Sequence, residues 1–154
     1  MELTVDEALQ RGIAAHKEGK LEAAELFYRS ILQVHPNHPD ANHNLGALAM
    51  SVGKEQDALL FFKLALEANP SIEQFWLSYA TALIESGHLD EARQALADAT
   101  LNGIAPKKLG ILSDQIQQTR TRIVPSHEQQ KKLLACYENR RFDEAETLAR
   151  SMIN

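Results

Sequence analysis

Residues 42–70 read NHNLGALAMSVGKEQDALLFFKLALEANP, and their spacing decides the fold. Apolar residues recur at helical intervals on both sides of Gly53, and Pro70 follows the second apolar stretch. This pattern is typical of two amphipathic helices joined by a short turn. We therefore expect a helix, a turn at Gly53 and a second helix that ends before Pro70.

The same pattern returns on both sides of this stretch at an interval of 34 residues. Pro36 and Pro70 have this spacing, and Ile104 holds the next position of the column. Four further columns are in phase over three copies: Gly19, Gly53 and Gly87; Ala24, Ala58 and Ala92; Tyr28, Phe62 and Leu96; Gly12, Gly46 and Ala80. Each copy is a helix pair that cannot bury its apolar face alone. We therefore expect the three copies to stack into a right-handed superhelix.

Two of the columns predict specific packing. A glycine inside a helix costs about 1 kcal/mol relative to alanine, so Gly12 and Gly46 need a packing reason. The reason we expect is a close approach of the paired helix, which the missing side chain permits. The glycines of the Gly53 column end the first helices, where a left-handed residue is needed.

These residues resemble the tetratricopeptide repeat family. Residues 42–70 show the pattern of that family most fully, with Leu45, Gly46, Gly53, Ala58, Phe62, Ala65 and Pro70. Residues 75–99, FWLSYATALIESGHLDEARQALADA, add the tryptophan and the aromatic residue of the family at Trp76 and Tyr79. Repeat one places Ala8 and Arg11 in the columns of Trp76 and Leu45, which suits an N-terminal repeat with one side facing water.

The predicted fold class is all-α, a right-handed superhelical solenoid of helix–turn–helix units. We expect three repeats over residues 5–104, with approximate bounds 5–38, 39–72 and 73–106. After them we expect an extra helix on repeat three at 107–119, a linker at 120–125, and a degenerate, truncated fourth helix pair at 126–154. In that pair Ala145 takes the alanine column and Arg140 replaces the turn glycine. The apolar C-terminal end predicts that more chain or a partner covers it.

Charge and composition exclude several classes of protein. The net charge is −5, with 16 Lys and Arg against 21 Asp and Glu, which argues against nucleic-acid binding because that needs a basic surface. The single cysteine, Cys136, excludes an internal disulfide framework and suits a reducing compartment. The N-terminus lacks the pattern of a signal peptide, and no apolar run approaches the roughly 20 residues of a membrane span. We expect a cytoplasmic protein without a membrane partner.

No combination of residues predicts catalysis. The paired carboxylates in LDEA at 89–92 and FDEA at 142–145 open second helices, where acidic side chains suit the helix dipole. His35, His38 and His43 fall close together, but the repeat places the first two in a helix junction and His43 on a first helix. We therefore expect no catalytic residue, no metal site and no cofactor.

The resemblance implies that the first helices line a concave, ligand-binding groove. Three rows of matching positions would face it: Leu9, His43 and Leu77; Gln10, Asn44 and Ser78; Ile13, Ala47 and Thr81. Lys17, Ser51 and Glu85 would lie one turn further along the three helices. The row that contains Asn44 is similar to the asparagine ladder of O-GlcNAc transferase repeats, whose amides hold a peptide backbone. Leu9 and Ile13 occupy positions where chaperone-binding domains carry carboxylate-clamp residues, which argues against a carboxylate clamp.

The sequence therefore predicts a non-catalytic scaffold that binds an extended peptide or a partner helix in this groove. The resemblance extends to the N-terminal repeats of large bacterial proteins, so the chain would be the recruiting module of, for example, a protein glycosyltransferase, sulfotransferase or methyltransferase. Two alternatives stay open. One is self-association into a homodimer through the C-terminal helices, and the other is an enzyme fragment with a direct catalytic function.

Overall fold

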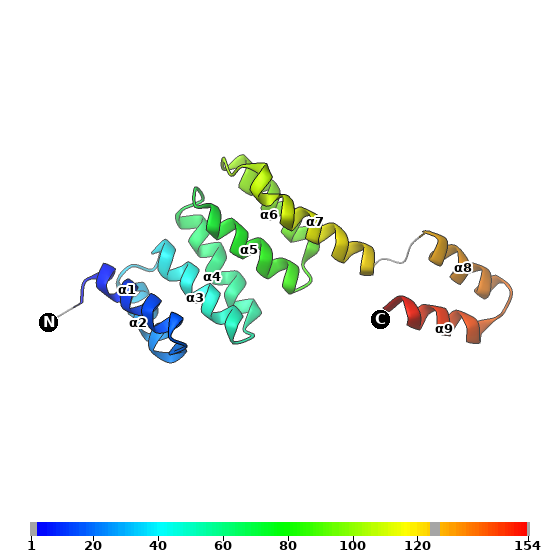
Figure 1. Cartoon of the computed structure of the whole chain (residues 1–154), viewed down its shortest axis with the longest axis horizontal. Coiled ribbons are helices and arrows are strands. Elements are labelled where there is room, and N and C mark those ends of the chain that lie inside the picture. Colours follow the sequence, from blue (N-terminus) through cyan, green and yellow to red (C-terminus); the bar gives the residue numbers. More distant parts are fainter. Residues whose placement is uncertain (1–2, 124–126, 154) are drawn as a thin grey trace. The chain divides into compact units, whose positions relative to one another are not determined.

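The computed structural model describes residues 3–123 and 127–153, and within these ranges it contains nine α-helices and no strand (Figure 1). The described residues fall into two compact units, which divide between Ser113 and Asp114. The helices are α1 (Val5–Lys17), α2 (Leu21–Val34), α3 (Pro39–Ser51), α4 (Glu55–Ala68), α5 (Glu73–Glu85), α6 (Leu89–Leu101), α7 (Pro106–Ile123), α8 (His127–Glu138) and α9 (Phe142–Ile153). The prediction of an all-α solenoid is confirmed.

In the first unit α1 to α6 form three helix–turn–helix pairs that stack in chain order (Figure 1). The turn of each pair holds a glycine with positive φ: 74° at Gly19, 71° at Gly53 and 78° at Gly87. The residue after each glycine donates its N–H to a carbonyl five residues back, as Lys54 does to Ala49 at 2.8 Å. This bond closes the end of the first helix in a Schellman motif, which requires a left-handed residue.

The glycines inside the first helices allow the second helices to approach closely. A Cβ built on Gly12 would lie 2.5 Å from Cε1 of Tyr28, and one built on Gly46 would lie 2.7 Å from Cδ1 of Phe62. Both rings are almost completely buried. The third repeat combines Ala80 with a smaller partner, Leu96, and both residues are buried.

A recurring hydrogen bond holds the junction between one repeat and the next. The side-chain amide of Asn42, which is completely buried, donates to the carbonyl of Pro36 at 3.0 Å. Thirty-four residues later the indole N–H of Trp76 donates to the carbonyl of Pro70 at 2.7 Å. Two chemically different side chains therefore fix the chain at the same point of two junctions.

Helix α7 is longer than predicted. It covers Pro106–Ile123 instead of 107–119, so residues 120–123 are helical and their assignment to a linker was wrong; residues 124–126 lie outside the described part of the chain. The physical reason is that no glycine or proline interrupts the segment between Gly110 and Pro125. Near the start of α7, Lys108 Nζ donates to Glu73 Oε2 of α5 at 2.7 Å.

The second unit contains the helix pair α8–α9. Arg140, in the turn, has φ 55°, and the N–H of Arg141 bonds to the carbonyl of Cys136 at 2.9 Å. The turn is therefore built as in the first unit, but without the glycine. Ala145 is buried, and no other side chain of α8 or α9 that the structure describes is buried to the same degree.

The close approach at Gly46 predicts opposite effects for two glycine substitutions. Gly46→Ala would place a methyl group against the Phe62 ring, and we expect a loss of about 1–3 kcal/mol of stability from overpacking. Gly110→Ala in α7 meets no atom within 4 Å, and we expect a gain of about 0.5–1 kcal/mol from helix propensity. Thermal and urea unfolding followed by circular dichroism would measure both changes. A stabilising Gly46→Ala would contradict the packing argument.

Candidate functional site

A hollow of about 340 Å³ lies between the first helices of repeats two and three, and we call it the α3–α5 hollow. Its floor is apolar and its edges carry an amide, two hydroxyls and a carboxylate. It is lined by Ala47, Met50, Phe62, Gln74, Leu77, Ser78, Thr81, Ala82 and Glu85. Four residues of the predicted groove, Ala47, Leu77, Ser78 and Thr81, are therefore brought together in one place.

Sequence reasoning did not include Met50 and Gln74 among the candidate residues, whereas it placed Glu85 one turn beyond the groove rows. The signal that could have found them is the helical period. Gln74 lies four residues before Ser78 and Met50 lies three residues after Ala47, so both extend the predicted stripes by one turn. Glu85 follows Thr81 by four residues on the same face.

His43 lies beside the α3–α5 hollow and connects repeat two to repeat three. Its Nε2 is 2.9 Å from Oγ of Ser78, and its ring stacks on Phe75 with the ring centroids 4.8 Å apart. Its ring centroid also lies 5.6 Å from that of Phe62. The amide of Gln74 donates to Ser78 Oγ at 3.3 Å, so the Ser78 hydroxyl is free to donate to a neutral His43.

The environment of His43 favours its neutral form. Burial lowers the pKa of the imidazole below the ordinary value of 6.5. A hydrogen bond with the Asn44 side chain and the charge of Asp40 oppose this shift without cancelling it. The half-buried His43 therefore forms, through Ser78, a polar connection between repeats two and three next to the hollow.

The other predicted groove residues lie on α1 and do not line the α3–α5 hollow. Leu9 and Ile13 are half-buried and pack against the cluster of core residues around Tyr28 and Leu45. Gln10 and Lys17 are exposed. The predicted groove residues therefore lie in two places. Those on α3 and α5 line or adjoin the α3–α5 hollow, and those on α1 lie on a separate surface of repeat one.

The three histidines near the first junction make different contacts, and that of His43 with Ser78 is described above. His35 follows α2, and its N–H bonds to the carbonyl of Ile31 at 2.8 Å. His38 precedes α3, and its Nδ1 accepts the N–H of Ala41 at 3.3 Å. No group of three or more His, Cys, Asp or Glu side chains that could hold a metal ion occurs among the residues the structure describes.

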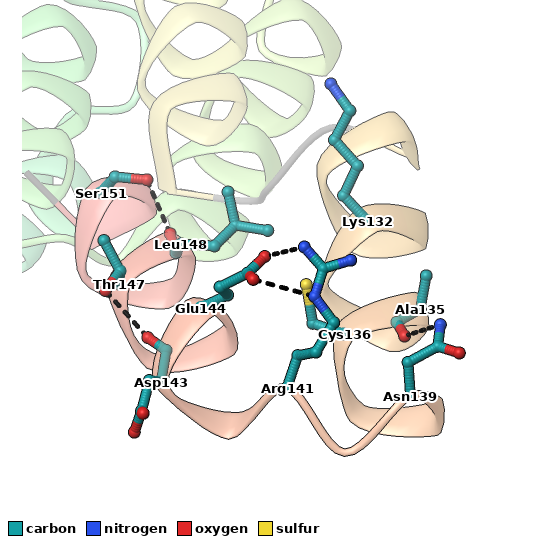
Figure 2. Close-up of a pocket in the computed structure, with 10 residues that line it drawn as sticks. All are labelled: Lys132, Ala135, Cys136, Asn139, Arg141, Asp143, Glu144, Thr147, Leu148 and Ser151. Carbon is teal, nitrogen blue, oxygen red and sulfur yellow. Dashed lines mark hydrogen bonds and ion pairs between the residues drawn. The ribbon is translucent and has the colours of Figure 1, made fainter.

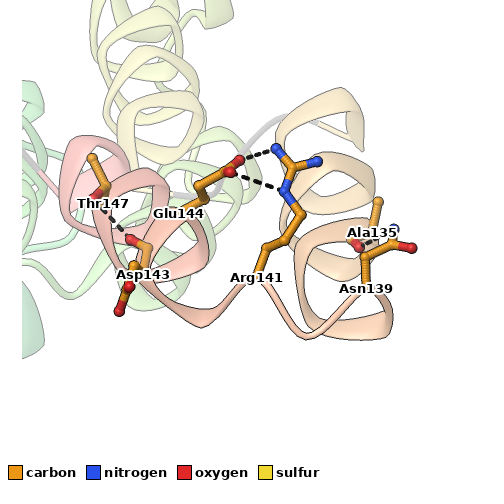
Figure 3. A network of polar contacts seen from close by, with 6 residues as sticks. All are labelled: Ala135, Asn139, Arg141, Asp143, Glu144 and Thr147. Carbon is orange, nitrogen blue, oxygen red and sulfur yellow. Dashed lines mark hydrogen bonds and ion pairs between the residues drawn. The ribbon is translucent and has the colours of Figure 1, made fainter.

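The largest hollow described, about 640 Å³, lies within the α8–α9 pair, and Figure 2 shows the side chains that surround it. Several of its polar groups already bond within the helix pair. Arg141 pairs through two nitrogens with Glu144, Asn139 donates to the carbonyl of Ala135 at 2.7 Å, and Thr147 donates to that of Asp143 at 2.9 Å (Figure 3). We consider the α3–α5 hollow to be the better candidate site, because it brings four of the predicted groove residues together.

No helix within residues 3–123 and 127–153 is both long enough and apolar enough to span a membrane.

The stack of helix pairs and its α3–α5 hollow define a helical-repeat solenoid. The sequence profile of the tetratricopeptide repeat matches residues 49–103, so the chain carries tetratricopeptide repeats. A curated relative is the cellulose synthase operon protein C of Komagataeibacter sucrofermentans, with 30% identity over 108 residues. The match covers 70% of this chain and only 8% of that protein.

Solved structures share the fold at low sequence identity. The TPR2B domain of yeast Sti1, solved in complex with pHsp70, superposes with a TM-score of 0.68 at 18% identity, covering 75% of this chain and 97% of that domain. A mutant of the O-GlcNAc transferase of Thermobaculum terrenum superposes with a TM-score of 0.59 at 21% identity, covering 67% of this chain and 21% of the enzyme.

The lowered pKa of His43 predicts a loss of stability in acid. Below its ordinary value of 6.5 the unfolded chain takes up the proton more readily than the folded chain, so the free energy of unfolding decreases as the pH falls through this value. We expect His43→Gln to show a smaller decrease in melting temperature between about pH 7.5 and pH 5 than the unsubstituted protein. His35→Gln, at an exposed position, is the matched control. An equal decrease in all three proteins would contradict this assignment.

Proposed function

We propose that this tetratricopeptide-repeat scaffold binds an extended peptide or a helix of a partner protein in the α3–α5 hollow. The observation that carries the proposal is the meeting of Ala47 and Thr81 with Leu77 and Ser78 around one accessible hollow. These residues come from the corresponding faces of two neighbouring first helices. A ligand that lies in the hollow between the two helices would contact both repeats at once.

The chemistry of the hollow suits a polypeptide ligand. Met50 and the apolar floor can accept a side chain, and methionine adapts its shape to different partners. Gln74, Ser78 and Thr81 offer both donors and acceptors at the edge, which can bond to backbone amides whatever their side chains are.

The structural comparison supports the same function. The Sti1 domain, which has the same fold, was solved with a bound partner. The ligand of our chain would differ in chemistry, because the predicted groove rows contain a single cation, Lys17, which lies on α1 away from the hollow. A clamp for a C-terminal carboxylate is therefore not part of the proposal.

We also propose that the repeats recruit a protein to a longer bacterial protein, such as a glycosyltransferase that acts on proteins. The bacterial relatives support this proposal, since the matched segments are 7–8% of their length. The fold shared with the Thermobaculum O-GlcNAc transferase is also consistent with it. The predicted cytoplasmic location stays a prediction.

Blocking the hollow tests the proposed function. Thr81→Arg would place a long side chain in the hollow while keeping a good helix former in α5. We expect peptides selected on the unsubstituted protein from a random linear library to bind this variant at least about tenfold more weakly, a cost of about 1.4 kcal/mol. Fluorescence anisotropy with labelled peptides would measure the change.

Thr100→Arg is the matched control, because it makes the same substitution at an exposed position of α6 outside the hollow. Its affinity should equal that of the unsubstituted protein. If Thr81→Arg kept full affinity, or if both variants lost it equally, the hollow would not be the binding surface.

Self-association is a second candidate function, favoured by exposed apolar side chains on the second unit. Leu134 is 59% exposed on α8 and Phe142 is 57% exposed at the start of α9. If these helices pair between copies, Leu134→Glu should abolish a rise of mass with concentration in analytical ultracentrifugation. Ile111→Glu, at a position 76% exposed on α7, is the control and should leave the mass profile unchanged. A concentration-independent monomer mass would contradict this function.

A further inference from the structure

The α3–α5 hollow has two chemically different ends. Gln74 lies in the first turn of α5 and Glu85 is the last residue of that helix, and both line the hollow. Eleven residues separate them, which corresponds to about 16 Å along the helix axis. An extended chain covers this length with about five residues. The hollow is therefore long enough to bind a short extended segment of a partner. The amide of Gln74 lies at one end of the hollow and the carboxylate of Glu85 at the other.

The middle of the hollow is built to accept an apolar side chain. Phe62 and Ala82 are buried beneath it, and Ala47, Met50 and Leu77 form half-buried walls. Ala47, the smallest of these wall residues, lies one turn from Met50 on α3, and Leu77 lies on α5. The short Ala47 side chain leaves room between the two helices. A leucine, methionine or phenylalanine side chain that entered this space would exchange water for apolar neighbours.

Glu85 gives its end of the hollow a negative charge. The carboxylate makes no ion pair with any residue in the described ranges, and no cation lines the hollow. Glu85 also stands at the C-terminus of α5, where the helix dipole adds partial negative charge. Lys17, the cation of the predicted groove rows, lies on α1, two first helices away and therefore about 20 Å distant at ordinary helix spacing. A ligand that carried a positive charge would complement this end.

We infer that the hollow selects a segment with a large apolar residue and a lysine or an arginine within four positions of it. The apolar side chain enters between Met50 and Leu77, and the cation reaches Glu85. An aspartate or glutamate of the ligand in place of this lysine or arginine is repelled by the Glu85 carboxylate and by the C-terminal end of α5. This inference rests on the proposed function, because it names the class of ligand for the same hollow.

The test is a selection from a random linear peptide library displayed on phage, carried out on the full chain. We expect the enriched peptides to share an apolar residue with a nearby lysine or arginine. The variant Glu85→Lys should enrich peptides that carry aspartate or glutamate instead. This variant should keep the fold, since lysine is favourable in the last turn of a helix. Peptides enriched on the unsubstituted protein should bind Glu85→Lys at least about tenfold more weakly.

Glu67→Lys is the matched control. Glu67 is exposed in the last turn of α4 and does not line the α3–α5 hollow, so the same change of charge should leave the enriched sequences unchanged. Enriched peptides without an excess of lysine and arginine would overturn the inference. So would a preference for basic peptides that Glu85→Lys does not alter.

The outcomes separate the inference from the proposed function. Peptides that lose affinity for Thr81→Arg but show no charge preference would keep the hollow as the binding surface and overturn only its ligand class. Peptides that bind Thr81→Arg normally would overturn the proposed function. A library that yields no enriched peptide would contradict both.

Discussion

The contact between a helical glycine and an aromatic ring determines how the repeats are built. The ring of Phe62 occupies the space that a Cβ on Gly46 would need, and Tyr28 does the same at Gly12. This contact sets the distance between the two helices of a repeat, and the stacking of repeats depends on that distance. Other pairs of side chains can fill the space between the two helices of a repeat. In repeat three Ala80 replaces the glycine and the smaller Leu96 replaces the aromatic ring. In the α8–α9 pair the same columns hold Leu133 and Ala149, so the larger residue has moved to the first helix.

The same aromatic ring links the core to the candidate site. Phe62 fills the space at Gly46, lies near the ring of His43 and forms part of the floor of the α3–α5 hollow. The hollow is therefore not an independent surface feature. The depth of the hollow depends on how closely α4 packs against α3, the two helices of repeat two. A substitution that relaxed the Gly46 contact would be expected to change the shape of the floor and the position of His43 together.

Periodic residues made the fold predictable, because each helix pair repeats the same packing and every copy confirms the others. The positions of Ala47, Ser78 and Thr81 around one hollow followed from the same columns. The contact of His43 with Ser78 did not, since it joins residues 35 apart and depends on how two repeats stack. The length of α7 was missed because this helix has no second copy for comparison. Asn42 was not recognised as the counterpart of Trp76, because the two side chains have only a hydrogen-bond donor in common.

The hydrogen bond of Trp76 has an optical consequence. This residue is the single tryptophan of the chain, it is buried, and its indole N–H is bound to the carbonyl of Pro70. Its emission therefore depends on the polarity and order of one place, the junction between repeats two and three. The corresponding junction between repeats one and two is held by Asn42, which does not fluoresce. The protein thus carries an intrinsic fluorophore in the first turn of α5, the helix that forms one wall of the α3–α5 hollow.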